Sequence, residues 1–191
     1  MELILASQSP RRRELLGLTG LDFVVRVADI DETMDKSLPA ADEVARVSRK
    51  KAMAVKRSPG DVVVAADTIV VCGGEILGKP KNEDDAFRML SMLSGRDHQV
   101  MTGMTVMRDD EVHTETEVTD IHFRELLPEE IRAYIATGEP MDKAGAYGIQ
   151  GSAALFATGL RGDYYNVMGL PVCRLAQILR QMGLPVWGVR A

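Results

Sequence analysis

One stretch decides the fold: Asp61-Val62-Val63-Val64-Ala65-Ala66-Asp67-Thr68-Ile69-Val70-Val71. Its β-branched residues follow one another without the alternation of a strand that has one face in water, so the stretch predicts a strand buried on both faces. Sheets that contain such strands carry helices on both sides. Gly73-Gly74 comes directly after and predicts a tight hairpin turn.

Strand and helix patterns alternate outward from this stretch. Residues 3–6 predict a strand, and Ser9-Pro10 predicts the start of a helix directly after it. The other elements predicted from apolar periodicity are strands at 23–27, 98–107 and 111–123, helices at 41–56, 82–95, 128–138 and 171–182, and a glycine-rich loop at 142–151 that approaches another segment closely. This order predicts an α/β fold, a mixed, twisted β-sheet flanked by helices in a single domain of residues 1–191.

The helix that starts at Ser9 carries an unusual set of charges. Ser9 suits the N-cap and Pro10 the first helical position, so backbone amides and the positive end of the helix dipole point the same way. Arg11-Arg12-Arg13 then stands in the first turn, where cations are unfavourable unless an anion binds. Two interpretations stay open at this point: a clamp for a phosphate chain, or an ordinary solvated face.

Two acidic sites add to this picture. Asp67 lies within an apolar strand, where an unpaired carboxylate would cost several kcal/mol, so a metal ion, a lysine or a strand-end cap must compensate it. Asp31-Glu32 is either a solvated acidic loop or a second carboxylate site. Carboxylates without nitrogen or sulfur ligands suit Mg²⁺ or Mn²⁺, which typically bind one or two carboxylates together with substrate phosphates. The candidate phosphate-binding side chains are Arg12, Arg13, Lys51 and Lys79.

Composition excludes several classes of protein. With 191 residues, 46% of them hydrophobic, the chain can bury the core of one domain with two lobes. The net charge of -5 and the aromatic content of 5% argue against a nucleic-acid-binding protein. Two cysteines without a CxxC pair, no secretory leader and no long apolar span predict a cytoplasmic protein without a membrane segment. P-loop, dinucleotide-binding, nucleophile-elbow and zinc-protease motifs are absent from the sequence.

Six motifs occur in order along the chain. They are Leu5-Ala6-Ser7-Gln8-Ser9-Pro10-Arg11-Arg12, Ala66-Asp67-Thr68, Gly78-Lys79-Pro80, Thr137-Gly138-Glu139-Pro140, Asp142-Lys143-Ala144-Gly145-Ala146-Tyr147-Gly148-Ile149-Gln150-Gly151 and Tyr165-Asn166-Val167-Met168-Gly169-Leu170-Pro171. Together they resemble the Maf family of nucleoside triphosphate pyrophosphatases over nearly the whole chain. The resemblance implies hydrolysis of a nucleoside triphosphate to the monophosphate and pyrophosphate. It also implies an inosine triphosphate pyrophosphatase-like fold with a central cleft, a divalent cation (Mg²⁺, Mn²⁺ or Co²⁺) and a cytoplasmic homodimer.

The resemblance also implies roles for individual residues. The catalytic set would be Asp67 as proton acceptor with Lys51, Lys79 and Arg13, the metal carboxylates would be Glu32 and Asp67, and the substrate-binding set would be Ser7, Ser9, Arg11, Arg12, Thr68 and Gln150. Within the family, Arg11, Thr68 and Gln150 resemble the branch that acts on dTTP and UTP. The Gln150 amide offers one donor and one acceptor, complementary to the O4 and N3–H edge of uracil or thymine.

Two other functions remain open from the sequence. The same residues would serve a nucleotide-binding regulator of cell division or septum formation that has no significant turnover, although the two acidic sites argue for catalysis. A nucleic-acid module using the arginine cluster is the weaker alternative, because the acidic net charge and sparse aromatics oppose it.

Overall fold

The computed structural model describes residues 1–35 and 37–189. Contacts divide the chain into unit 1 (Met1–Asp67, Thr102–Glu117 and Gly169–Ala191) and unit 2 (Thr68–Met101 and Val118–Met168). Within these described residues, seven strands form one sheet in the order β2-β1-β3-β5-β6-β7, with β4 paired to β3. The sheet is mixed, because β1 is parallel to both β2 and β3 whereas β3–β4 and β6–β7 are antiparallel.

Unit 1 is built on a short parallel core. β1 (Leu3–Leu5) pairs with β2 (Val24–Val25) on one side and with the first part of β3 (Val62–Cys72) on the other, in the register Leu5 opposite Val64. β3 is buried along almost its entire length, which confirms the prediction of a strand covered on both faces.

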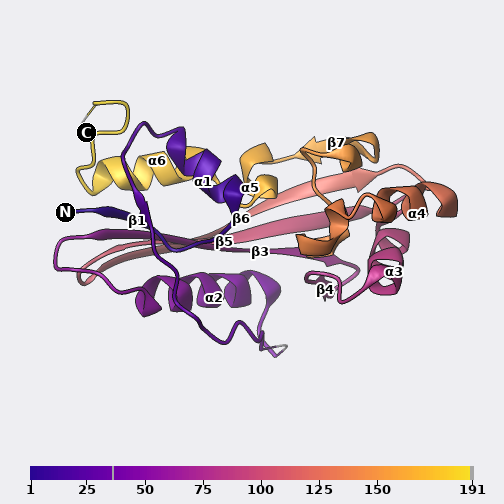
Figure 1. The fold of residues 1–191 in the computed structure, drawn as a ribbon, viewed down its shortest axis with the longest axis horizontal. Helices are drawn as coiled ribbons and strands as arrows, with labels where there is room; N and C mark the ends of the chain where they lie inside the picture. Colours follow the sequence, from indigo (N-terminus) through magenta and orange to yellow (C-terminus); the bar gives the residue numbers. More distant parts are fainter. Residues whose placement is uncertain (36, 190–191) are drawn as a thin grey trace. The chain divides into compact units, whose positions relative to one another are not determined.

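Helices cover both faces of these strands. Figure 1 shows α2 on one side, and α1 and α6 on the other. Their bounds are Pro10–Gly17 for α1, Ala40–Ala54 for α2 and Val172–Gln181 for α6. α2 therefore starts one residue before the predicted range and ends two residues earlier, because Val55 adopts an extended backbone conformation.

α2 approaches the sheet unusually closely at Gly103 in β5 (Asp97–Arg108). A Cβ atom on Gly103 would lie 2.3 Å from the carbonyl oxygen of Val44 and 2.7 Å from the backbone nitrogen of Ala45. The helix backbone thus rests directly on the strand, with no side-chain layer between them. The hydroxyls of Ser48 in α2 and Thr105 in β5 hydrogen-bond at 2.8 Å beside this contact.

Unit 2 packs helices and a glycine-rich segment around a second core. After the hairpin at Gly73 and Gly74, both with positive φ, β4 leads to α3, whose N-cap Asn82 accepts a hydrogen bond from the Asp85 amide as predicted. The helices and strands of unit 2 are β4 (Glu75–Leu77), α3 (Glu83–Leu93), α4 (Pro128–Ala136), β7 (Ala157–Arg161) and α5 (Tyr164–Met168). Three 3₁₀ turns lie at Glu139–Asp142, Ala144–Ala146 and Ser152–Leu155. Strand β6 (Glu111–Phe123) has residues in both units.

The glycine-rich stretch 142–151 makes the predicted close approach. Gly145 has φ +67°, its amide donates to the carbonyl of Gly78, and a Cβ atom there would lie 2.7 Å from Val70. The stretch is more regular than predicted, since Ala144–Ala146 forms a 3₁₀ turn. β7 and α5 were not predicted. None of the helices in the described part of the chain is both long and apolar enough to cross a lipid bilayer.

His98 lies in the core of unit 2. It is only 2% exposed, its Nε2 hydrogen-bonds the hydroxyl of Tyr147 at 2.8 Å, and its ring packs edge-on against Phe123. Burial lowers the pKa of His98 from 6.5 to about 4. The native state therefore holds the imidazole neutral, whereas the unfolded chain protonates it below its ordinary pKa.

We expect unfolding free energy to fall as the pH drops from 6.5 toward 4, because the unfolded state gains a proton there that the native state does not bind. A shift of this size corresponds to roughly 3 kcal/mol. In His98→Gln, which stays neutral, this part of the pH dependence should vanish. Urea unfolding of both proteins between pH 4 and 8 checks it, and parallel pH curves for the two would contradict the assignment to His98.

Candidate active site

The candidate site of unit 1 lies just beyond the carboxyl end of β1, where β3 continues to Asp67. Because Leu5 is opposite Val64, the segment after β1 leaves the sheet at the carboxyl end of the parallel core, next to the part of β3 that leads to Asp67. The amide of Ala6 extends the pairing by donating to the carbonyl of Val64 at 2.8 Å. In parallel α/β sheets, ligands bind at this carboxyl-terminal edge.

Three residues at this edge form an acid–lysine cluster: Glu32, Lys51 and Asp67. Nζ of Lys51 lies 2.7 Å from Oδ1 of Asp67 and 2.8 Å from Oε2 of Glu32. Asp67 is 8% exposed, so it is the buried carboxylate that the sequence required to be compensated, and in this structure a lysine does so. The two acids, 35 residues apart in sequence, thus converge on one cationic atom.

The N-terminus of α1 stands beside this cluster. Ser9 caps the helix by accepting a hydrogen bond from the Arg12 amide at 3.4 Å, and its own amide donates to Oγ of Ser7 at 3.2 Å. The Arg12 side chain donates through Nε to the carbonyl of Gly169 at 2.8 Å and through Nη1 to Ser7. Ser7 and Ser9 therefore hold the helix start and one of its arginines in a fixed arrangement.

The charges of the acid–lysine cluster act on the pKa of Arg12. Burial lowers the pKa of Arg12 from its ordinary value, and the carboxylates of Asp67 and Glu32 oppose this shift while Arg11 adds to it. Positive charge in the first turn of a helix is unfavourable by itself. The arrangement favours an anion that could bind the helix start and the arginine together.

The loop that carries Glu32 is held by one face of α2. Lys50 donates to the carbonyl of Asp31, the guanidinium of Arg46 donates to the carbonyl of Thr33, and the amide of Asp35 donates to Glu43. Glu43 has no exposed side-chain surface and pairs with Arg46 at 2.6 Å. Hydrogen bonds from Arg46 hold the pKa of Glu43 below its usual value. Sequence analysis missed this restraint, although the spacing 43, 46 and 50 places all three side chains on one helix face.

Arg46→Gln is expected to loosen this loop. The shorter, neutral side chain cannot serve both Thr33 and Glu43, so the amide of Asp35 should exchange with solvent hydrogen roughly tenfold faster or more, as expected when a locally held segment opens more easily. Hydrogen exchange measured residue by residue tests this. Arg49→Gln is the matched control, because Arg49 is exposed on the same helix and shows no side-chain hydrogen bond to a described residue. Equal exchange in the two variants would count against the restraint.

The donor set of the cluster fits a hard divalent cation. Glu32 and Asp67 offer carboxylate oxygens around one point, and Mg²⁺ characteristically takes one or two carboxylates and completes its shell with water and phosphate. Among the described residues no group of three or more His, Cys, Asp or Glu side chains could hold a metal ion. Glu32 and Asp67 are the two carboxylates that this cluster could offer to such an ion.

The other predicted site residues fall into two groups. In α1, Arg11 is partly buried, and Arg13 is exposed with no side-chain hydrogen bond or ion pair to another described residue. In unit 2, Thr68 follows Asp67 in β3, Lys79 is exposed two residues after β4, and Gln150 is exposed between two 3₁₀ turns. The structure thus brings Ser7, Ser9, Arg12, Glu32, Lys51 and Asp67 together within unit 1.

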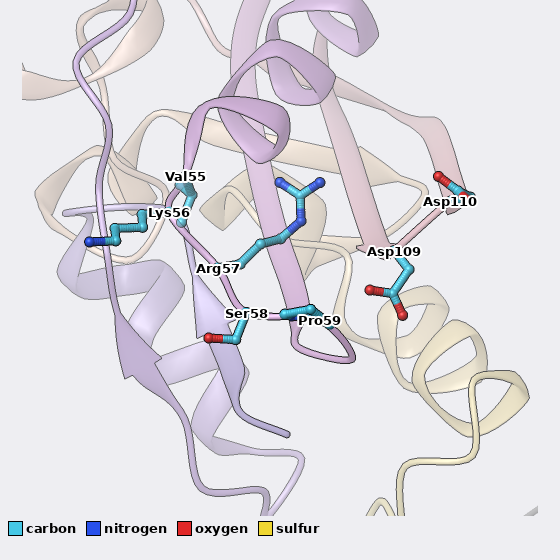
Figure 2. A pocket seen from close by; sticks show the side chains of 7 residues that line it. All are labelled: Val55, Lys56, Arg57, Ser58, Pro59, Asp109 and Asp110. Carbon is cyan, nitrogen blue, oxygen red and sulfur yellow. The ribbon is translucent and has the colours of Figure 1, made fainter.

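A separate depression of about 500 Å³ lies elsewhere in unit 1. Figure 2 shows that its walls come from the turn after α2 and from the β5–β6 turn. Lys56 and Arg57 line it on one side and Asp109 and Asp110 on the other, so the formal charges of its lining balance. None of the predicted site residues lines this depression, and it has no bias toward a phosphate.

The fold has relatives among solved structures. The Ham1 protein of Staphylococcus aureus matches with a TM-score of 0.53 and 14% identity over 95% of this chain and 100% of that one. A HAM1 protein of Coxiella burnetii matches with a TM-score of 0.51 and 15% identity over 95% and 99%. These likenesses concern the fold, and they confirm the predicted α/β class with a mixed sheet flanked by helices.

Comparison with known sequences identifies the family of the chain. The chain belongs to the Maf family, whose model, described as Maf-like protein, matches residues 2–182. Proteins named dTTP/UTP pyrophosphatase match over nearly their full lengths. The one from Symbiobacterium thermophilum is 51% identical over 97% of this chain and 96% of its own, and the one from Moorella thermoacetica is 49% identical over 98% of each. The predicted family is confirmed.

Proposed function

We propose that this chain is a pyrophosphatase that hydrolyses dTTP and UTP to the monophosphate and pyrophosphate, with modified pyrimidine nucleotides as further candidates. The observation that carries the proposal is the convergence of Glu32 and Asp67 on Lys51 beside the partly buried Arg12. About 50% identity to proteins named dTTP/UTP pyrophosphatase, over nearly the whole chain, supports the substrate class.

In this proposal the helix start binds the triphosphate. Arg12, held by Ser7 and the carbonyl of Gly169, would pair with phosphate oxygens, and the α1 amides would add their partial charge. Arg11, Arg13 and Lys79 are proposed as further phosphate contacts, and Thr68 and Gln150 as residues that select the base. Hydrolysis at the α-phosphorus is mainly a matter of position and charge, because pyrophosphate leaves as a multiply charged anion.

Asp67 is proposed to orient a water molecule and accept its proton. Lys51, 2.7 Å from this carboxylate, would orient it by a hydrogen bond and add positive charge near the leaving oxygens. A divalent ion bound by Glu32 and Asp67 would neutralise phosphate charge and align the nucleotide. Mg²⁺, Mn²⁺ and Co²⁺ are the candidates.

One panel tests the function. The purified chain is mixed with dTTP, UTP, CTP, ATP and GTP, each with Mg²⁺, Mn²⁺ or Co²⁺, and pyrophosphate release is measured. Release that is fastest with dTTP and UTP and that stops with a chelator is the expected result. Tight binding of UTP without release would favour the alternative, a nucleotide-binding regulator of cell division.

The setting of the reaction is also a proposal. The family resemblance supports a cytoplasmic homodimer that acts on free nucleotides and takes neither nucleic acid nor membrane as partner. Sedimentation of the purified chain at micromolar concentration tests the dimer, and the absence of binding to single-stranded DNA at low salt tests the partner prediction.

A further inference from the structure

The turn that carries Gln150 is tied at both ends to one pair of side chains in unit 2. The amide of Gly151 donates to the carbonyl of Gly148 at 3.0 Å, so residues 148–151 form a tight turn with Gln150 at its third position. At the start of the turn, the amide of Gly148 donates to the hydroxyl of Tyr134 at 3.1 Å. Just after it, the amide of Ser152 donates to Oε2 of Glu139 at 3.1 Å.

Glu139 and Tyr134 are themselves joined. The Tyr134 hydroxyl donates to Oε1 of Glu139 at 2.9 Å, and Nζ of Lys143 donates to the Glu139 backbone carbonyl at 2.6 Å. The ring of Tyr134 is fixed by edge-on packing against Phe156 in the core. Each carboxylate oxygen of Glu139 therefore accepts one hydrogen bond, from an anchored tyrosine and from the backbone after the turn.

The backbone of the turn lies directly against the Glu139 carboxylate. A Cβ atom on Gly151 would lie 2.1 Å from Oε1 of Glu139, so no side chain can replace this glycine unless the carboxylate moves. Gln150, by contrast, is exposed. The restraint acts on the backbone beneath Gln150 and leaves its amide group available.

We infer that Glu139, acting with Tyr134, is a positioning residue that sets the preference for uracil and thymine over cytosine by fixing the turn beneath Gln150. The inference rests on the proposed function, in which the Gln150 amide pairs with the base edge. A site built to hydrogen-bond a base discriminates only as well as its donor and acceptor are held in place. Glu139 itself touches no substrate in this scheme.

The test compares kcat/KM for UTP with kcat/KM for CTP, which carries an amino group where UTP has O4. In Glu139→Gln the side-chain amide cannot accept both the tyrosine proton and the Ser152 amide, so the UTP:CTP ratio should fall about tenfold, on the scale of a charge-assisted hydrogen bond. Tyr134→Phe keeps the ring packing and should shift the ratio in the same direction. Glu129→Gln, an exposed glutamate on α4, is the matched control and should leave the ratio within twofold.

The background variant Gln150→Ala completes the test. If Glu139 acts through Gln150, Glu139→Gln should have no further effect on the ratio once Gln150 is removed. A merely structural role would lower both kcat/KM values by one factor and leave the ratio unchanged in every background, which would overturn the inference. Failure of the proposed function is seen separately, as absence of pyrophosphate release from UTP by the unaltered protein. Should Glu139→Gln fail to fold, Tyr134→Phe alone decides.

Discussion

Asp67→Asn is expected to fold normally and to lose about 10²–10⁴ of its turnover on UTP, the usual cost of removing a general base. Asparagine has nearly the same shape and still accepts a hydrogen bond from Lys51, so the packing of β3 should survive. What it cannot do is take a proton from water or bind a divalent ion as an anion. Steady-state pyrophosphate release, together with thermal unfolding of the same preparation, measures both halves of the expectation.

Asp61→Asn is the matched control for this variant. Asp61 is a buried aspartate directly before the same strand, and it accepts amide hydrogen bonds from Glu2 and Ser58. Those hydrogen bonds hold the pKa of Asp61 below its ordinary value. We expect this control to lose stability and to keep its turnover. Near-normal turnover in Asp67→Asn would refute the role assigned to Asp67.

Lys51→Met should be among the most destabilising single changes in unit 1. It leaves Asp67, 8% exposed, and Glu32 without the ammonium between them, and removing one partner of a largely buried ion pair typically costs several kcal/mol. We expect a loss of about 2–4 kcal/mol in unfolding free energy, measured by urea denaturation near neutral pH. Pyrophosphate release should fall as well, because the phosphates lose a cation.

A double variant separates the electrostatic part of this loss of unfolding free energy from the part due to lost packing. Lys51→Met combined with Asp67→Asn has no stranded carboxylate at 67, so much of the stability should return if the cost is electrostatic. Lys50→Met is the neighbouring control for the loss of a lysine from α2. Lys50 donates its hydrogen bond to the backbone carbonyl of Asp31, so this substitution removes no ammonium from between two carboxylates. Simple additivity of the two substitutions at 51 and 67 would show that the ion pair contributes little.

The strongest local patterns predicted most of the fold. The β-branched stretch that became β3 and the Asn82 cap of α3 agree with the structure, because burial on both faces and side-chain capping act over a few neighbouring residues. β7 escaped prediction since four of its five residues are exposed and it contains Gly159, so neither alternation nor an apolar run marks it. Only its pairing with β6 makes it a strand.

The sequence named Glu32, Lys51 and Asp67 as candidates but did not predict the contacts among them. The sequence required that Asp67 be compensated, and it left a metal, a lysine and a cap as possibilities. The choice of Lys51 depends on how α2 lies against β3, which no local pattern encodes. The same holds for the restraint of the Glu32 loop by Arg46 and Glu43, whose charges could equally have met solvent.

Gly103 lets the backbone of α2 lie directly against β5. Packing between side chains can be re-optimised by compensating substitutions, because one group shrinks as another grows. The contact of Gly103 with the Val44–Ala45 peptide has no such freedom, since both surfaces are main chain. A Cβ atom at 103 would collide with the backbone of α2, and a shift of α2 that relieved the collision would move Lys51 as well. Through this one contact, a residue that bears no functional group sets how close α2 lies to the sheet, and with it the place of the Lys51 ammonium between its two carboxylates.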